Sequence, residues 1–178
     1  SWNMKKFIIV AGIAACVVGA HVQADQAPFP KVMDGRLKIS LVAVEPEIVT
    51  PTGITVDASG RVLCIENHTH QRDENYDGPP TDRIKMFRDT DGDHRADRIT
   101  TFFEGTKDTM NLAACPDGSV YVATRREIVR LMDTDGDGRA DQSTQIARLK
   151  TVASYPHNGL SGFAFDEFGN VVFGLGEN

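Results

Sequence analysis

Two short loops place aspartates at a spacing that suits metal binding. The stretch "DTDGDHRAD" covers residues 89–97 and "DTDGDGRAD" covers residues 133–141, so the second begins 44 residues after the first. Carboxylates this close repel one another unless a cation lies among them. Positions 1, 3, 5 and 9 are aspartate, and the carbonyl at position 7 can complete an oxygen cage: Asp89, Asp91, Asp93, Arg95 and Asp97, then Asp133, Asp135, Asp137, Arg139 and Asp141.

Calcium is the ion that this pattern predicts, because it prefers a flexible shell of oxygen ligands at about 2.3–2.6 Å. Gly138 stands at position 6, where an EF-hand loop turns sharply, and His94 takes that place in the first loop. Position 12 is Thr100 or Thr144 rather than the bidentate glutamate of an EF-hand. We therefore predict two structural calcium loops that are not EF-hands. The alternative is a pair of solvated acidic turns, which aspartate and glycine also favour.

A second group of possible metal ligands lies in the polar stretch 67–82. His68 and His70 are two residues apart, so on an extended segment their side chains point to the same side. Asp73 and Glu74 follow closely and could complete a site. The alternative is that these residues are ordinary polar surface.

Short strands must position these loops. Three segments show the pattern strand, tight turn, strand, with Asp-Gly, Ser-Gly or similar turns between alternating apolar residues: 53–65, 111–123 and 162–174. A second kind of hairpin alternates with them and carries the aspartate loops. Each unit then holds four strands over about 45–55 residues, the period of one blade of a β-propeller. We predict an all-β fold, a partial β-propeller of about three four-stranded blades out of about six. A β-sandwich with coincidental turn spacing is the alternative.

The N-terminal stretch has the parts of a secretory signal peptide. Met4 is followed by two lysines, and the apolar run "FIIVAGIAACVVGA" is too short to span a bilayer comfortably. "HVQA" then supplies a small-residue cleavage site that ends at Ala24. We predict a signal peptide region over 1–24 with Met4 as the initiator, a linker over 25–36, and the N-terminal part of a propeller domain over 37–178, truncated at its C-terminus.

This interpretation predicts an exported protein, periplasmic or on the cell surface. "IAAC" also fits a lipoprotein box, in which Cys16 would be lipidated and would tether the protein without making it span. Membrane association is then expected at most through such an anchor or through another domain. The net charge of −6 argues against nucleic acid as a partner. Cys64 and Cys115 are expected to be buried thiols, since they lie in apolar runs.

Three long stretches resemble a known family: "ENHTHQRDENYDGPPTDRIKMFRDTDGDHRADR", "GSVYVATRREIVRLMDTDGDGRADQ" and "YPHNGLSGFAFDEFGNVVFGLGEN". They are similar to the N-terminal propeller of planctomycete-type membrane-bound dehydrogenase-like proteins. Those proteins are large, exported and similar to glucose/sorbosone dehydrogenase propellers. In full-length members a helical-repeat region and a haem-binding CxxCH cytochrome c domain commonly follow. The resemblance covers nearly all of residues 37–178.

The resemblance implies a quinoprotein-like dehydrogenase that oxidises a sugar or other alcohol with pyrroloquinoline quinone. Electrons would pass to a cytochrome c domain, with its haem c, or to another acceptor outside this chain. His157 matches the histidine that acts as general base, although the match slips by about one residue and "FDEFGN" replaces the usual turn. Arg72, Arg125 and Asn158 are the candidates for binding the cofactor. The alternative is a non-catalytic, calcium-stabilised propeller that binds glycans or protein partners.

Overall fold

The computed structural model describes residues 6–10, 30–70, 72–150 and 159–176, and for residues 6–10 it describes the backbone alone. Strands and turns make up these ranges, and none of their residues is helical. The strands are β1 (Lys6–Val10), β2 (Lys38–Ala43), β3 (Pro51–Val56), β4 (Val62–Glu66), β5 (Asp82–Arg88), β6 (Arg98–Thr106), β7 (Thr109–Ala114), β8 (Val120–Thr124), β9 (Glu127–Met132), β10 (Gln142–Arg148), β11 (Leu160–Phe165) and β12 (Val171–Leu175). The predicted all-β class is confirmed.

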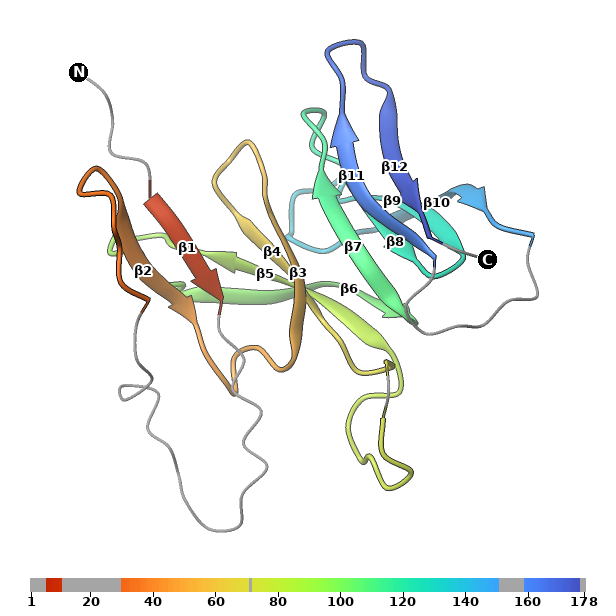
Figure 1. Cartoon of the computed structure of the whole chain (residues 1–178), viewed down its shortest axis with the longest axis horizontal. Coiled ribbons are helices and arrows are strands. Elements are labelled where there is room, and N and C mark those ends of the chain that lie inside the picture. Colours follow the sequence, from red (N-terminus) through yellow and green to blue (C-terminus); the bar gives the residue numbers. More distant parts are fainter. Residues whose placement is uncertain (1–5, 11–29, 71, 151–158, 177–178) are drawn as a thin grey trace.

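Two four-stranded antiparallel sheets form the centre of the structure (Figure 1). The first sheet has the order β3-β4-β5-β6 and the second has the order β7-β8-β9-β10, so each is a simple meander of consecutive strands. β11 and β12 form a two-stranded antiparallel sheet. Of the three or so four-stranded units predicted, the described residues contain two complete units and one pair of strands, and the arrangement of such units as propeller blades stays a prediction.

The aspartate-loop hairpins of the two sheets have the same register. Arg88 pairs with Arg98 in β5–β6. The equivalent pair in β9–β10, 44 residues later in the sequence, is Met132 with Gln142. Each outer strand also has a bulge at the same place. Phe102 of β6 and Ile146 of β10 are unpaired at equivalent positions, and β6 has a second unpaired residue at Gly105. The sequence repeat is thus a structural repeat down to single residues.

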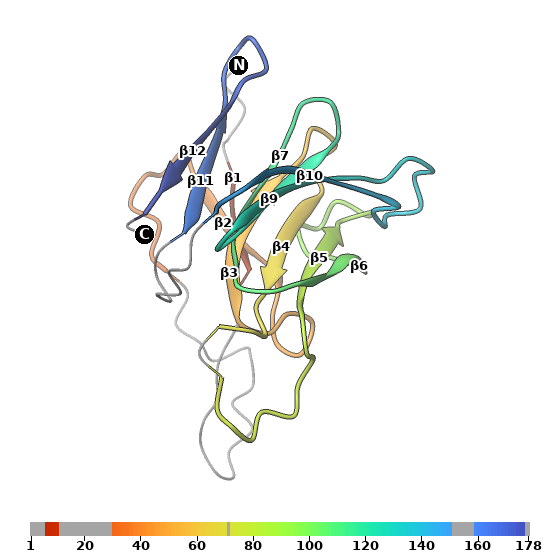
Figure 2. The ribbon, with the colours of Figure 1, turned by 90° about the vertical axis from the view of Figure 1, so that its right-hand side faces the viewer.

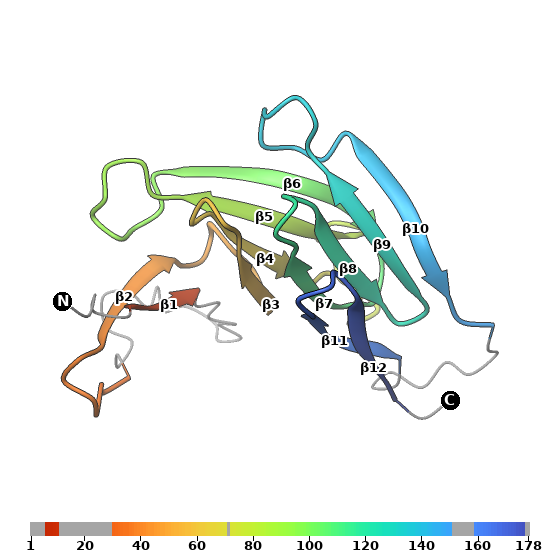
Figure 3. The ribbon, with the colours of Figure 1, turned by 90° about the horizontal axis from the view of Figure 1, so that it is seen from above.

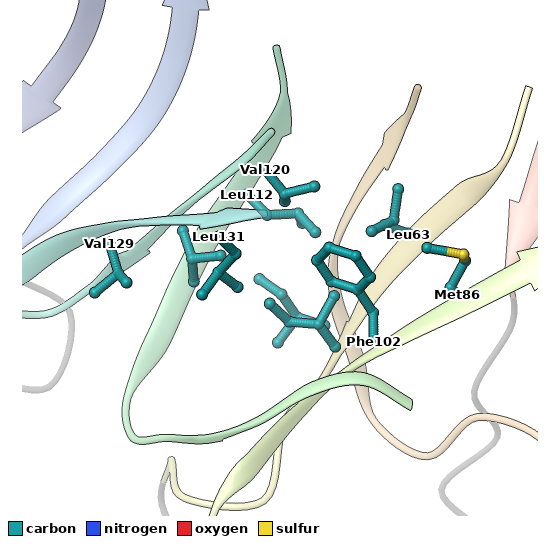
Figure 4. Packing of buried hydrophobic residues seen from close by; sticks show 10 residues of the cluster. Leu63, Met86, Phe102, Leu112, Val120, Val129 and Leu131 are labelled. Carbon is teal, nitrogen blue, oxygen red and sulfur yellow. The ribbon is translucent and has the colours of Figure 1, made fainter. Parts of the chain in front are cut away.

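The main hydrophobic core lies between the two four-stranded sheets (Figure 4). Figure 4 shows Phe102 of the first sheet pointing toward Leu112, Val120 and Leu131 of the second. The alternation of apolar and polar residues along each strand directs one face into this core. The buried members are Leu63, Ile65, Ile84, Met86, Phe102, Leu112, Val120, Val122, Val129 and Leu131.

Smaller clusters extend the core on both sides. β2 contributes Val42 and Ala43 to a cluster with Val62, Cys64 and Phe87 of the first sheet. On the far side of the second sheet, Ala123, Ile128 and Leu160 pack together, with Tyr121 and Phe163 against them. Apolar faces on both sides of each sheet explain why β4 is buried at every position.

The first strands of the three sheets lie next to one another, and the outer strands lie away from them. Figure 3, which views the chain from above, shows β3 and β7 on the inner side and β6 and β10 on the outer side. The backbone N–H of Ala114 in β7 donates to Oγ1 of Thr55 in β3 over 3.2 Å. Gly53 allows the close approach of β3 to β7, because a Cβ atom there would lie 3.2 Å from Cδ2 of Leu112 in β7.

β1 pairs in parallel with β2. This strand lies inside the segment predicted to be a signal peptide, so a cleaved chain would keep β2 without this partner. The cleavage site at Ala24 and the lipidation candidate Cys16 lie outside the described residues. Within the described part of the chain, no helix is long and apolar enough to cross a membrane.

Candidate functional site

The first aspartate loop joins β5 to β6 and gathers three carboxylates. Oxygen atoms of Asp89, Asp91 and Asp97 lie within 4.8 Å of one another, and all three residues are exposed. Asp97 accepts hydrogen bonds from the backbone N–H and the hydroxyl of Thr90, at 3.1 and 2.5 Å. Asp93 is not part of this group; its carboxylate accepts the N–H of Arg95 at 2.7 Å.

The second loop joins β9 to β10 and repeats most of these bonds. Its close group is Asp133, Asp135 and Asp137, again within 4.8 Å. Asp141 is outside that group and accepts the backbone N–H of Thr134 at 3.1 Å together with its hydroxyl. The carboxylate of Asp137 accepts the N–H of Arg139 at 2.7 Å. Each loop therefore brings three of its four predicted carboxylates together, and the carbonyl ligands predicted at Arg95 and Arg139 stay a prediction.

The backbone of both loops has the predicted sharp turn at position 6. His94 has φ of 77° and Gly138 has φ of 92°, both in the left-handed region. Their N–H groups donate to the first aspartate of each loop, at 2.9 Å to Asp89 and 3.0 Å to Asp133. These bonds curl the loop around its first carboxylate, as a cation-binding loop requires.

Hydrogen bonds keep two of these carboxylates ionised at low pH. The hydroxyl and the backbone N–H of Thr134 lower the pKa of Asp141. Loss of hydration acts to raise the pKa of Asp89, but the N–H groups of Gly92 and His94 outweigh it, so the pKa falls below its usual value. The loops thus carry concentrated negative charge at neutral pH, which a divalent cation would neutralise.

Each aspartate loop also contacts the outer strand of the preceding sheet. The N–H of Ala140 donates to the carbonyl of Phe102 in β6 over 2.8 Å. In the same way, the N–H of Ala96 donates to the carbonyl of Val42 in β2 over 3.0 Å. The hydroxyl of Thr100 adds a 3.4 Å bond to the carbonyl of Gly138. The loops are therefore located at junctions between sheets, so a metal there would act on the junction.

A buried polar network surrounds Asp82 at the strand ends that lie opposite the aspartate loops, a region called the polar edge below. The polar loop between β4 and β5 projects from this edge (Figure 2). Asp82 is fully buried, and its carboxylate accepts the N–H of His68 at 2.7 Å and the hydroxyl of Thr69 at 2.8 Å. It also accepts the N–H and the hydroxyl of Thr109, at 2.9 and 2.7 Å. One carboxylate therefore connects the start of β5, the polar loop and the start of β7.

His68 is buried with partners on both sides of its ring. Its Nδ1 lies 2.5 Å from the hydroxyl of Tyr76, and its Nε2 lies 3.1 Å from a carboxylate oxygen of Glu66, without the alignment of a hydrogen bond. The guanidinium carbon of Arg72 lies 4.4 Å from the centre of the Tyr76 ring. The structure does not bring His68 and His70 together with Asp73 and Glu74 as a metal group.

Arg125 lies at the same edge, in the turn between β8 and β9. Its backbone N–H donates to the carbonyl of Asp108 at 3.0 Å, and its guanidinium forms an ion pair with the Asp108 carboxylate at 3.2 Å. Gly159 packs so closely that a Cβ atom there would lie 2.6 Å from the Arg125 carbonyl oxygen. A depression of about 290 Å³ here is rich in cations; its lining is Lys107, Asp108, Thr124, Arg125, Arg126, Glu127 and Arg148.

The predicted catalytic and cofactor residues are only partly described. Arg72 and Arg125 both lie at this polar edge, each with its own partner, Tyr76 or Asp108. His157 and Asn158 lie outside the described residues. The buried carboxylate of Asp82 was not among the predicted site residues, because nothing in the sequence separates it from the exposed aspartates of the same loop.

The two cysteines differ in exposure. Cys64 is buried in β4, and burial raises the pKa of its thiol to about 12, with the neighbouring Glu66 carboxylate adding to the rise. Cys115 is only half-buried, in the turn after β7, so the prediction of two buried thiols is correct for Cys64 alone. A thiol with so high a pKa is inert as a nucleophile at neutral pH.

Comparison with known proteins gives a family and several distantly similar solved structures. One of these structures is described as "Iodide structure of Trichoderma reesei Carbohydrate-Active Enzymes Family AA12"; it shares 16% sequence identity, with a TM-score of 0.45. The match covers 62% of this chain and 26% of that one, so this chain spans about a quarter of its length. No curated protein matches the sequence. The family model described as "Domain of unknown function (DUF7133)" matches residues 31–167, and the chain therefore belongs to the DUF7133 family.

Proposed function

We propose that this chain is the N-terminal part of an exported, calcium-stabilised β-propeller that acts as a quinoprotein-like dehydrogenase on a sugar or other alcohol. The observation that carries the proposal is the polar edge shared by the two four-stranded sheets. There the loop between β4 and β5, the β6–β7 connection and the β8–β9 turn meet around Asp82 and Arg125. Loops at one end of a rigid β scaffold are the usual position of binding and catalytic residues.

The repeat of the two sheets supports the propeller. Four-stranded meanders whose first strands are adjacent, and whose hairpins share one register, are the units that a propeller arranges around an axis. The β11–β12 pair begins a further unit in the same way, since Leu160 packs on Ala123 and Ile128 of the second sheet.

The arginines of the polar edge have the chemistry that a carboxylate-bearing quinone needs. Nε and Nη2 of Arg72 and Nε of Arg125 are buried and lack a hydrogen-bond partner among the described residues. A guanidinium group binds carboxylates through parallel N–H bonds, so these atoms fit the acidic groups of pyrroloquinoline quinone. Asn158 could add an amide donor. Asp108 would hold Arg125 in place while the guanidinium binds.

The reaction removes a hydride and a proton from an alcohol and leaves a carbonyl compound. When bound, the quinone would supply the acceptor for the hydride, and the electrons would then pass to a cytochrome c domain or another acceptor. His157 would take the hydroxyl proton, because an imidazole with an ordinary pKa near 6.5 is suited to general-base catalysis at neutral pH.

Replacing His157 by alanine in the full-length gene product should reduce the rate by about 10²–10⁴-fold, the usual contribution of a general base. The assay is dye reduction over a panel of sugars and alcohols, with the protein supplied with pyrroloquinoline quinone and calcium. Ser59→Ala is the control, since Ser59 is exposed in the turn between β3 and β4, outside the polar edge, and should leave the rate unchanged. Wild-type turnover in His157→Ala would remove this residue from the mechanism.

The second candidate function is a non-catalytic propeller that binds glycans or protein partners. It is favoured by the contacts of Asp82, because the hydrogen bonds from His68, Thr69 and Thr109 occupy this buried carboxylate and leave it unavailable for acid–base work. Equilibrium binding of the quinone to the full-length product separates the two functions. If the wild-type protein does not bind the quinone, the dehydrogenase proposal is wrong and the binding function stands.

Calcium should bind to the chain at about two sites, one in each aspartate loop, as measured by titration calorimetry. Asp135→Ala should remove one site, since Asp135 belongs to the close group of the second loop. Calcium at about 100 times its Kd should add about 2.7 kcal/mol per occupied site to the free energy of unfolding. Asp77→Ala, an exposed aspartate outside both loops, should keep both sites. Absence of binding heat and of any stability change would identify the loops as acidic turns.

A further inference from the structure

Three polar side chains connect the end of β4 with the surface of the polar loop: Glu66, His68 and Tyr76. The side chains of Glu66 and His68 are only 5% and 4% exposed, whereas Tyr76 is 40% exposed. Nδ1 of His68 lies 2.5 Å from the Tyr76 hydroxyl, and its Nε2 lies 3.1 Å from Oε2 of Glu66. A carboxylate, an imidazole and a hydroxyl in this order form the arrangement by which enzymes activate a nucleophile.

The carboxylate of Glu66 determines which nitrogen of His68 can accept a proton. A neutral imidazole has one N–H group and one nitrogen with a free lone pair. The hydrogen is more stable on Nε2, because this nitrogen faces the negative carboxylate even without the alignment of a hydrogen bond. Nδ1 then accepts a hydrogen bond from the Tyr76 hydroxyl, so His68 can take the hydroxyl proton.

Contacts with the backbone hold this carboxylate and this imidazole in place. The N–H of Val49 donates to Oε1 of Glu66 over 3.0 Å, which leaves Oε2 to face His68 and, at 3.8 Å, Nη1 of Arg83. The N–H of His68 donates to the buried carboxylate of Asp82 over 2.7 Å. Because the base is already oriented, proton transfer needs little rearrangement.

Two neighbours of Tyr76 also suit its hydroxyl to react. The guanidinium carbon of Arg72 lies 4.4 Å from the centre of the Tyr76 ring, so a positive charge is close when negative charge develops on the phenol. Gly78 leaves room for the hydroxyl, since a Cβ atom at this position would lie 2.2 Å from the hydroxyl oxygen. Tyr76 is exposed enough for a small substrate to approach it from the solvent.

From these contacts we propose that Tyr76 is the nucleophile of an acyl-transfer site, with His68 as its base and Glu66 as the residue that positions His68. The substrate class is a carboxylic ester, because a hydroxyl activated by an imidazole and a carboxylate is suited to attack on an acyl carbon. The site uses neither the quinone nor calcium. It is therefore independent of the dehydrogenase function.

The proposed reaction has two steps. The Tyr76 oxygen bonds to the ester carbonyl carbon while its proton moves to Nδ1 of His68. The bond from this carbon to the alcohol oxygen breaks, and the alcohol leaves with the proton from His68. Water then attacks the acyl-tyrosine with His68 again as base, which releases the carboxylic acid and restores the Tyr76 hydroxyl.

Acetylation by p-nitrophenyl acetate tests the proposal in the purified chain. Trypsin releases residues 73–83 as one peptide in which Tyr76 is the only tyrosine, so mass spectrometry of acid-quenched samples can follow its acetyl group. Tyr76 should be acetylated at least about 100-fold faster than N-acetyltyrosinamide at the same pH, since general-base catalysis contributes about 10²–10⁴-fold. A rate equal to that of N-acetyltyrosinamide would overturn the proposal and identify the three residues as a structural network.

His68→Gln should lower the rate at Tyr76 to about that of N-acetyltyrosinamide, and an unchanged rate would overturn the role of His68. Glu66→Gln should lower it at least about 10-fold, because the orientation of the base is lost. In the wild type the rate should fall at acid pH, where His68 takes up a proton. In Glu66→Gln this fall should occur at lower pH, because the imidazolium has lost a neighbouring negative charge.

Gly78→Ala tests the geometry without changing a buried or ionisable group, and so remains informative if substitution of His68 impairs folding. Its methyl group would displace the Tyr76 hydroxyl, so the acetylation rate should fall about as far as in His68→Gln. Tyr121→Phe is the matched control, since Tyr121 contacts Phe163 and Phe165 and lies outside the polar loop. It should leave the rate at Tyr76 unchanged. Wild-type acetylation in Gly78→Ala would contradict the proposal.

Discussion

Replacing Asp82 by alanine should lower the free energy of unfolding by about 3–5 kcal/mol, more than any other single aspartate of the chain. The carboxylate accepts hydrogen bonds from His68, Thr69 and Thr109, and both Asp82 and Thr109 are buried. Alanine would leave these donors without partners, and each buried unpaired donor costs about 1–3 kcal/mol. The measurement is urea unfolding followed by circular dichroism.

Two comparison variants make this result specific. Asp82→Asn keeps one acceptor oxygen and should lose roughly half as much stability, since hydrogen bonds to a charged group are the stronger ones. Asp77→Ala changes an exposed aspartate of the same loop and should stay within about 0.5 kcal/mol of the wild type. An Asp82→Ala variant as stable as the Asp77→Ala variant would show that water replaces the carboxylate in the network.

Phe102→Ala should cost about 3–5 kcal/mol, as truncation of a buried phenylalanine usually does. The ring is 2% exposed and fills the space between the two four-stranded sheets, against Leu112 and Leu131. Its loss leaves a cavity in the core between the first sheet and the second. Thermal unfolding should therefore show both a lower Tm and a broader transition, because the sheets would no longer unfold as one unit.

The chain contains its own control for this experiment. Ile146 stands at the same bulge of β10 but is 49% exposed, so Ile146→Ala in the 178-residue chain should change stability by less than about 0.5 kcal/mol. Similar losses for the two variants would mean that the bulge geometry, and not the packing between sheets, determines the cost.

The sequence predicts the local parts of this fold well. The segments 53–65, 111–123 and 162–174 correspond to the hairpins β3–β4, β7–β8 and β11–β12. Alternating apolar residues and glycine turns act over a few residues, so they can be recognised without knowledge of the rest of the chain. The positions of the two aspartate loops, and the left-handed backbone of His94, follow from the same short-range signals.

Contacts between distant segments could not be predicted in this way. Asp82 is one of several aspartates near the polar loop, and only the arrival of β7 with Thr109 buries it. Likewise, Phe102 and Ile146 occupy equal places in the repeat, and their different exposure depends on which sheet follows. Tertiary neighbours decide these features, whereas residue type and spacing decide the hairpins.

The direction of the loop contacts has a consequence for how the chain assembles as it is synthesised. The outer strands β2 and β6 are each covered by a loop that comes later in the sequence, so their packing is incomplete until that loop has emerged from the ribosome. Between Phe102 and Leu131 the delay is roughly one to six seconds at the usual rate of synthesis. During that interval an apolar ring and an open strand edge face the solvent, which invites aggregation or a holding chaperone. We expect the sheets to assemble in the order of the sequence. Each sheet would complete its packing only after the following sheet has formed against it.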